Sequence, residues 1–327
     1  MGQALAAAAT VRRRVAPRPG VGAVVVPASE PNHAGFVGAT DGRSGAHAEI
    51  LALAAAGNAA RGATLYVTLE PCSHHGTTPP CADAVIAAGV ARVVIAVIDP
   101  DPKVSGAGIA RMREAGIDVT VGCASDAVGR QLAPYLHHRL TGRPFVVLKL
   151  ATTLDGKTAA PDGTSQWITS EASRVDAHRL RADSDAILVG AGTAQADNPS
   201  LTVRLPAEER HPDDTEPLRI VLGTAPADAA MRPCLEMKGD LGTLLDELGA
   251  KGVLQLMVEG GASVAAAFHE AGLVNRYVLY MAPAFFAGEN AKGMFTGQGA
   301  NTLDQLWRGR IVDVARVGDD LRLEIEG

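Results

Sequence analysis

The stretch HAEILALAAAGNAARGATLYVTLEPCSHHGTTPPCADAVIAAG, residues 47–89, contains the pattern that decides the fold of the first half of the chain. An apolar run rich in β-formers lies between two segments with helical spacing, which predicts helix, strand and helix in succession. Gly57 and Gly89 stand where the two helices should end. The alternation continues on both sides and predicts an α/β layer sandwich with a mostly parallel sheet. The expected strands are 21–26, 64–69, 92–98 and 118–121, and the expected helices are 46–56, 80–88 and 106–115.

The second half of the chain shows the same alternation after a break. A helix expected over 126–140 ends at Thr141-Gly142-Arg143-Pro144, and a new strand is expected directly afterwards. We therefore predict domains at 1–143 and 144–327. Several strands gather near the end of the chain, which predicts a second α/β domain closed by an antiparallel edge. The expected helices are 171–182, 241–248 and 263–271, and the expected strands are 145–150, 186–189, 218–222, 253–258, 276–281, 311–317 and 321–325.

The composition argues against several classes of protein. The chain has 327 residues, of which 47% are hydrophobic, and a formal charge of −6. Nucleic-acid-binding domains normally have a basic face, and no apolar run here reaches the roughly 20 residues of a membrane span. Arg12, Arg13 and Arg14 follow the apolar N-terminal segment, whereas a secretory signal has its positive charge first. We expect a cytoplasmic protein whose four cysteines serve a metal site rather than disulfides.

Four residues of the opening stretch suggest a zinc-dependent catalytic site. His47 and Glu49 open a helix, Cys72 ends a strand, and Cys81 lies in the first turn of the next helix. One imidazole and two thiolates provide three zinc ligands and leave the fourth tetrahedral position to water. Glu49 would carry a proton from that water to the leaving ammonia, and the pattern is typical of nucleobase deaminases. The alternatives are a structural zinc site or unrelated buried cysteines.

The loop from Pro71 to Cys81 resembles the zinc loop of the bifunctional riboflavin-biosynthesis deaminase–reductase family, and the resemblance covers essentially the whole chain. It implies a cytidine-deaminase-like three-layer domain followed by a dihydrofolate-reductase-like α/β domain, with Zn²⁺ and NADPH as cofactors. The implied substrate is a small phosphoribosyl-pyrimidine: a diaminohydroxy-phosphoribosylamino-pyrimidine is deaminated, and its ribosyl group is then reduced to ribityl. A homodimer or higher homo-oligomer is expected, and neither nucleic acid nor membrane is an expected partner.

The second half resembles the reductase domain of that family through a series of short motifs in the family's order, among them 165–169, 196–199 and 201–204. The resemblance places Lys149 and Asp197 beside the opened ribose carbonyl as catalytic residues. The implied substrate-binding residues are Ser165, Arg181, Leu201, Arg204 and Glu259. The implied NADPH-binding residues are Ala151, Trp167, Thr193, Asp197, Thr224, Gly260 and Gly261.

Four positions around the deaminase substrate depart from the family pattern, namely Arg18, Thr40, Thr77 and Asp101. Thr77 replaces a basic residue, and a phosphate bound without a cation would lose the strongest hydrogen bonds available. We therefore hypothesise that Arg18, which lies between two prolines, binds that phosphate. A second interpretation is a paralogue that deaminates another pyrimidine and keeps its reductase-like domain for binding or assembly. The segment 223–240 is shorter than in the family and replaces a strand–helix–strand stretch beside the adenosine half of the cofactor.

Overall fold

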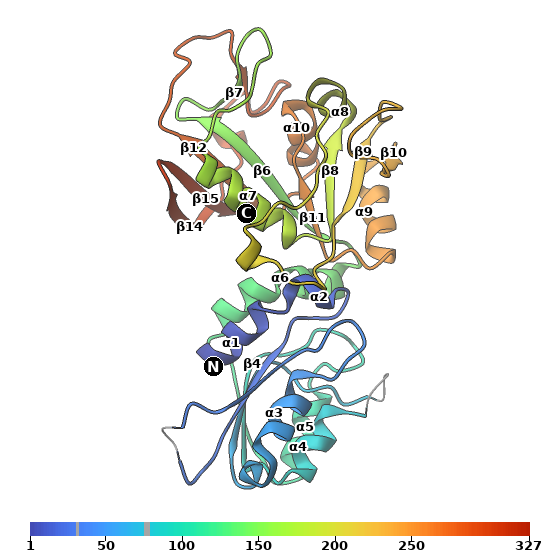
Figure 1. The fold of residues 1–327 in the computed structure, drawn as a ribbon, viewed down its shortest axis with the longest axis vertical. Coiled ribbons are helices and arrows are strands. Elements are labelled where there is room, and N and C mark those ends of the chain that lie inside the picture. Colours follow the sequence, from blue (N-terminus) through green and yellow to red (C-terminus); the bar gives the residue numbers. More distant parts are fainter. Residues whose placement is uncertain (31–32, 75–78) are drawn as a thin grey trace. The chain divides into compact units, whose positions relative to one another are not determined.

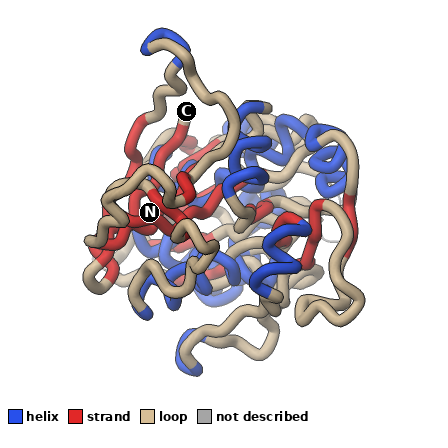
Figure 2. Tube along the Cα trace, turned by 90° about the horizontal axis from the view of Figure 1, so that it is seen from above, coloured by secondary structure: helices blue, strands red, loops and turns tan. Residues whose placement is uncertain are grey.

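The computed structural model describes residues 1–30, 33–74 and 79–327, and the chain forms two compact units, Met1–Gly142 and Arg143–Gly327 (Figure 1). Each unit has its own main sheet and its own buried core. None of the helices within the described ranges is long and apolar enough to cross a membrane. Loops, tan in Figure 2, join the elements, and the long one over 198–217 contains the short 3₁₀ helix η2 (Ala207–Glu209).

The sheet of the first unit has five strands in the order β2-β1-β3-β4-β5. β1 is antiparallel to both of its neighbours, whereas β3, β4 and β5 are parallel. The parallel part of the sheet was predicted, and β1 is the exception, because the short connection after β1 returns the chain as an antiparallel hairpin. The strands are β1 (Gly22–Val26), β2 (Phe36–Ala39), β3 (Thr64–Leu69), β4 (Arg92–Val97) and β5 (Asp118–Val121).

Helices cover both faces of this sheet and make three layers, with α1 and α6 on one side and α3, α4 and α5 on the other (Figure 1). β4 is buried along four consecutive residues, as a strand covered on both faces should be. The helices that start at the carboxyl ends of strands present their first turns towards one edge of the sheet. The helices are α1 (Gly2–Ala9), α2 (Arg12–Val15), α3 (Ala48–Ala56), α4 (Cys81–Ala87), α5 (Ala107–Glu114) and α6 (Ser125–Thr141).

The second unit is built on an eight-stranded sheet in the order β10-β9-β8-β11-β6-β12-β15-β14. The first six strands are parallel, and β15 is antiparallel to both β12 and β14, so the end of the chain forms the antiparallel edge that the sequence predicts. The strands are β6 (Phe145–Thr153), β8 (Ala186–Gly190), β9 (Leu218–Leu222), β10 (Leu235–Met237), β11 (Gln255–Val258), β12 (Arg276–Ala282), β14 (Arg310–Val317) and β15 (Asp320–Glu326). The small pair β7 (Lys157–Ala159) and β13 (Lys292–Gly293) lies apart from this sheet.

Two apolar clusters hold the helices of the second unit against its sheet. One joins Leu245, Leu248 and Phe268 to buried residues of the central strands, and the other joins Leu201 and Met231 to strand residues such as Ile187. Burial of such side chains stabilises the fold by about 1.5–3 kcal/mol each. The helices are α7 (Glu171–Ala182), α8 (Ala191–Asp197), α9 (Leu241–Ala250) and α10 (Ala262–Glu270).

The shortened segment 223–240 still contains regular structure. It contains β10, which pairs in parallel with β9 through Leu235, Glu236 and Met237. Three residues are too few to show a strand period, so backbone pairing with β9 decides the conformation here. The sheet therefore keeps an extra strand at this edge.

Candidate active sites

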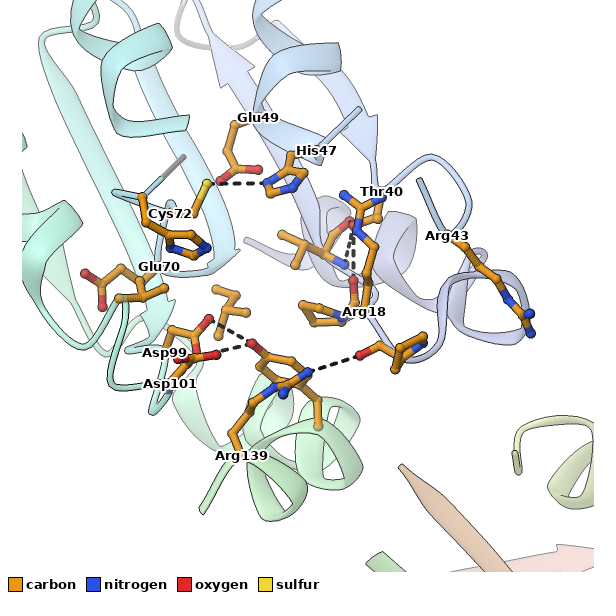
Figure 3. Close-up of a pocket in the computed structure, with 17 residues that line it drawn as sticks. Arg18, Thr40, Arg43, His47, Glu49, Glu70, Cys72, Asp99, Asp101 and Arg139 are labelled. Atoms are coloured by element: carbon orange, nitrogen blue, oxygen red, sulfur yellow. Dashed lines mark hydrogen bonds between the residues drawn. The ribbon is translucent and has the colours of Figure 1, made fainter. Parts of the chain in front are cut away.

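The three expected metal ligands lie together at the carboxyl end of β3. His47 is the N-cap residue of α3, Cys72 follows β3, and Cys81 is the first residue of α4. His47 Nδ1 lies 3.6 Å from Cys72 Sγ and 3.1 Å from Cys81 Sγ, and the three ligand atoms are all within 4.8 Å of one another. Tetrahedral zinc with bonds of about 2.0–2.3 Å places its ligand atoms at such separations. Figure 3 shows His47 and Cys72 at one end of a cavity.

The electrostatics of the two sulfurs suit a metal. The Cys81 thiol lowers the pKa of Cys72 to about 4 by donating a hydrogen bond to it, and the pKa of Cys81 itself is raised. The backbone N–H of Cys81 also donates to Cys72 Sγ at 3.3 Å, which favours a thiolate there. A metal ion takes the place of a thiol proton when it binds. The donor set therefore fits zinc.

Glu49 lies in the first turn of α3 with only 3% of its surface exposed. Burial raises its pKa to about 7, where a carboxyl group exchanges protons readily near neutral pH. Figure 3 shows its carboxyl group beside Cys72 and His47, on the wall of the same cavity. Glu49 therefore lies beside the three candidate ligands as a buried carboxyl group and is not one of the cluster that could hold a metal.

The cavity in front of these residues measures about 400 Å³ and contains three of the four positions that depart from the family pattern. Arg18 lies on its wall and donates through Nη1 to the carbonyls of Gly42 and Gly45, at 3.2 and 3.0 Å. Thr40 is buried and accepts from the N–H of Val21, whereas Asp101 lies on the far wall (Figure 3). Thr77 lies outside the described residues.

Three further residues on this wall were not predicted from the sequence. The Tyr135 hydroxyl donates to Asp99 Oδ2 at 3.0 Å, and burial raises the pKa of Asp99. The Arg139 guanidinium lies over the Tyr135 ring at 5.0 Å, and its Nε is buried without a hydrogen-bond partner in the described protein. Tyr135 and Arg139 come from α6, far along the chain, so no local motif could have pointed to them.

Glu70, directly after β3, links the loop that carries Cys72 to the N-terminus of α5. Its carboxylate accepts from the N–H groups of Gly106, Gly108 and Ile109, at 3.0, 3.1 and 3.3 Å. A side chain at Gly108 would lie 2.2 Å from the carbonyl oxygen of Pro71, so glycine is needed for this close approach. Glu70 thereby satisfies the helix N-terminus and fixes the loop that carries Asp99 and Asp101.

A second cavity, of about 500 Å³, opens in the second unit and brings together many of the residues implied there. Glu259, just after β11, accepts from Arg181 Nε and Nη2 at 2.9 and 2.8 Å and lies 3.9 Å from Lys149 Nζ. Burial lowers the pKa of Lys149. Burial alone would raise the pKa of Glu259, but the positive charges of Arg181 and Lys149 outweigh it and lower that pKa. The implied residues that line the cavity are Lys149, Trp167, Arg181, Thr193, Asp197, Leu201, Arg204 and Glu259.

Five implied residues are not on the wall of this cavity: Ala151, Ser165, Thr224, Gly260 and Gly261. Gly261 lies next to it, because a Cβ there would be 3.4 Å from Thr193 Oγ1. A Cβ at Gly260 would lie 2.5 Å from Cβ of Val264, so close packing against α10 is a sufficient reason for glycine at this position. Thr224 is exposed.

Other residues lining this second cavity were not anticipated. His178 and Arg174 come from the same face of α7 as Arg181, and Tyr280 comes from β12. The helical spacing of three and four residues between Arg174, His178 and Arg181 was the signal that could have found them. Tyr280 Oη donates to Asp176 at 2.9 Å beneath the cavity.

Comparison with known proteins identifies the family of both units. Residues 144–323 match the family model of the RibD C-terminal domain, and residues 1–97 match that of the cytidine and deoxycytidylate deaminase zinc-binding region. The riboflavin biosynthesis protein RibD of Bacillus amyloliquefaciens is 38% identical over 94% of this chain and 90% of its own, and that of Escherichia coli K12 is 37% identical over 100% and 98%.

Solved structures give the same result. Acinetobacter baumannii RibD, form 1, superposes with a TM-score of 0.91 at 34% identity over 99% of this chain and 97% of that one. The diaminohydroxyphosphoribosylaminopyrimidine deaminase/5-amino-6-(5-phosphoribosylamino)uracil reductase of Thermotoga maritima superposes with a TM-score of 0.86 at 31% identity, over 100% and 97%. The chain therefore belongs to the RibD family, the bifunctional enzymes of riboflavin biosynthesis in which a zinc-dependent deaminase domain precedes an NADPH-dependent reductase domain.

Proposed function

We propose that residues 1–143 deaminate a diaminohydroxy-phosphoribosylamino-pyrimidine and that residues 144–327 reduce the ribosyl group of the product to ribityl. The observation that carries the first half is the convergence of His47, Cys72 and Cys81 beside a buried Glu49. The observation that carries the second is a cavity in which Lys149, Arg181 and Glu259 form one ion-paired cluster.

In the deaminase site, His47, Cys72 and Cys81 would hold zinc, which supplies Lewis-acid activation of a water molecule when bound. Glu49 takes one proton from the attacking water and gives it to the ring nitrogen. It then takes the second proton from the resulting hydroxyl group and gives it to the amino group, which leaves as ammonia. Its burial matters because a carboxyl group with a pKa of about 7 both accepts and returns a proton near neutral pH. The helix N-termini of α3 and α4 favour negative charge at the ligands.

Arg18 is the proposed phosphate ligand of the deaminase substrate. Its side chain lies on the cavity wall, and two carbonyl acceptors hold Nη1, which orients the guanidinium. The remaining N–H groups would donate to phosphate oxygens, since guanidinium and phosphate form strong, charge-assisted hydrogen bonds. This proposal keeps the family substrate despite the replacement of a basic residue by Thr77.

The reductase cavity fits NADPH in two respects. Trp167 is 67% exposed at the cavity and offers a flat face for stacking, and α10 begins at Gly261 without a side-chain cap, next to Thr193. Uncapped helix N-termini bind phosphates. Ala151, Trp167, Thr193, Asp197, Thr224, Gly260 and Gly261 would hold the cofactor, which supplies the reducing hydride.

The substrate would lie against the ion-paired cluster. Lys149 and Asp197 are placed to polarise the ribose carbonyl and to move a proton to its oxygen. Arg181 keeps Glu259 in place and donates to the Thr202 carbonyl at 2.8 Å, so it presents few free donors. Ser165, Leu201 and Arg204 complete the proposed substrate contacts, with Arg204 the cation most available to a phosphate.

We further infer a cytoplasmic enzyme that acts as a homodimer or higher homo-oligomer, with neither nucleic acid nor a membrane as its partner. Apolar side chains gather on the edge hairpin of the second unit, where Ile311, Val314 and Leu321 are 57%, 58% and 41% exposed. An uncovered edge strand with such residues favours pairing with another chain. Sedimentation measurements of mass should give at least two copies.

The test is to supply the diaminohydroxy-phosphoribosylamino-pyrimidine and to follow ammonia release with and without NADPH. The proposal predicts ammonia release without NADPH, and NADPH oxidation only after it. A paralogue with another substrate is favoured by Arg18 and Asp101 on the cavity wall, where the family has other residues. That alternative predicts no ammonia from this pyrimidine but release from a pyrimidine without the phosphate.

A further inference from the structure

His178 lies on the wall of the reductase cavity with hydrogen-bond donors on both sides of its ring. The backbone N–H of Arg204 lies 3.3 Å from Nδ1, and Arg181 Nη1 lies 3.4 Å from the same atom. On the other side, Arg204 Nε lies 3.3 Å from Nε2. All three neighbours are donors.

An imidazole cannot satisfy this arrangement alone. A neutral ring has one acceptor nitrogen and one N–H, and a protonated ring has two N–H groups. Nδ1 has two donors beside it, one of them the backbone N–H of Arg204, so Nδ1 is the acceptor and Nε2 carries the ring N–H. The N–H at Nε2 then faces Arg204 Nε, which is also a donor, so an acceptor is missing on the Nε2 side.

The charge around His178 indicates which kind of acceptor belongs there. Lys149, Arg181 and Arg204 face it together with the carboxylate of Glu259, which Arg181 already engages. Burial and the positive charges of Arg181 and Arg204 lower the pKa of His178 to about 4, so its ring is neutral near pH 7. No ion pair within the described ranges involves Arg204. The excess of positive charge around His178 therefore favours the binding of an anion.

We propose that His178 is a ligand of the substrate's phosphate in the reductase site, accepting from the backbone N–H of Arg204 through Nδ1 and donating from Nε2 to a phosphate oxygen. The Arg204 guanidinium lies on the same side of the ring, with Nε 3.3 Å from Nε2, and can donate to the same phosphate. The proposal rests on the proposed reductase function and adds a residue to it. A phosphate monoester could also come from the 2′-phosphate of NADPH, so the experiment separates the two sources.

The experiment uses the full chain and measures NADPH oxidation with the deaminated phosphoribosyl substrate. His178→Ala should raise the KM for that substrate about tenfold or more, the scale of one hydrogen bond to a charged group, with kcat and the KM for NADPH nearly unchanged. The inhibition constant of inorganic phosphate against the substrate should rise in parallel. His178→Gln, whose amide reaches the position of Nε2, should recover part of the loss.

The controls keep the result interpretable. His211→Ala, in the loop before β9, should change neither constant, and His178→Leu replaces the alanine variant if that variant does not fold. An unchanged substrate KM in a folded variant, or a rise confined to NADPH, would overturn the proposal. Failure of the wild-type chain to reduce the substrate would instead overturn the proposed function, so the two failures are distinguishable.

Discussion

Two buried glutamates, one in each unit, show how surroundings assign different tasks to the same side chain. Glu49 has the metal ligands beside it, and burial raises its pKa to about 7. Glu259 is also buried, but the positive charges of Arg181 and Lys149 lower its pKa. The first carboxyl group can exchange a proton near neutral pH, whereas the second remains a fixed anion that positions two cations.

The largest effect should come from the metal ligands. Cys72→Ala removes one of three ligand atoms, so zinc and ammonia release should both be lost, while reduction of the deaminated intermediate continues. Metal analysis and the two activity assays on one preparation check this. Cys234→Ala, outside the cluster, serves as the matched control. Full deaminase activity in a zinc-free Cys72→Ala preparation would contradict the metal site.

The next effect is on stability. Glu259→Gln leaves Arg181 without its counter-charge at a site where both side chains are about 12–13% exposed, and breaking such a pair costs about 3–5 kcal/mol. Asp246→Asn breaks the exposed pair with Arg143, whose side chains are 37% and 58% exposed, and should cost at most about 1 kcal/mol. Chemical denaturation of each variant measures both. Equal losses would mean that Glu259 is not a fixed anion.

The lowered pKa of Glu259 also predicts a pH dependence. A carboxyl group whose folded pKa lies below its unfolded value contributes its full stability above the unfolded value and loses it as pH falls through the folded one. The difference in unfolding free energy between wild type and Glu259→Gln should therefore be constant near neutral pH. It should shrink below the ordinary glutamate pKa of about 4.3. A difference that grew on acidification would contradict the sign of the shift.

Glu49→Gln tests the proton carrier. The variant should retain zinc, because the amide leaves the three ligands in place, but turnover in deamination should fall by at least ~10²-fold. Zinc content and ammonia release in the steady state give the answer. Glu30→Gln, on the loop after β1, is a control that should behave as wild type. Normal turnover in Glu49→Gln would assign the proton transfer to another group.

The smallest predicted effect concerns the substrate phosphate. Arg18→Ala should weaken binding of the deaminase substrate by about 1.5–3 kcal/mol, the range for a charge-assisted hydrogen bond, and leave the reductase unchanged. Arg92→Ala is the control, because Arg92 lies at the start of β4 and is not among the described residues that line the cavity. An unchanged KM in Arg18→Ala would favour a substrate without that phosphate.

The two sites also differ in how far the sequence could predict them. The candidate metal ligands are close together in the sequence and could be predicted, because one strand and the first turns of two helices bring His47 and Cys81 to Cys72 at the same edge of the sheet. Tyr135 belongs to the same cavity, but α6 reaches it only through tertiary packing, which no spacing reveals. In the second unit, α7 presents His178 beside Arg204 across 26 residues of chain, and only the family resemblance suggested Arg204.

The fold shows the same limit. The long apolar strands β6 and β8 begin at the predicted residues, Phe145 and Ala186, because burial on both faces selects β-branched and aliphatic residues. β2 and β10 were not expected, because strands of four and three residues have no readable period and form by pairing with a neighbour. The antiparallel pairing of β1 with β2 was therefore not expected either.

The decisive measurement compares the two activities of one preparation before and after zinc is removed by a chelator. The substrate is the diaminohydroxy-phosphoribosylamino-pyrimidine. Ammonia release should stop on chelation and return when zinc is added, because the zinc held by His47, Cys72 and Cys81 is needed to activate the attacking water. NADPH oxidation with the deaminated intermediate should proceed at the same rate throughout. Ammonia release that persists in the zinc-free enzyme, or a reductase that fails with it, would contradict the assignment of two independent sites.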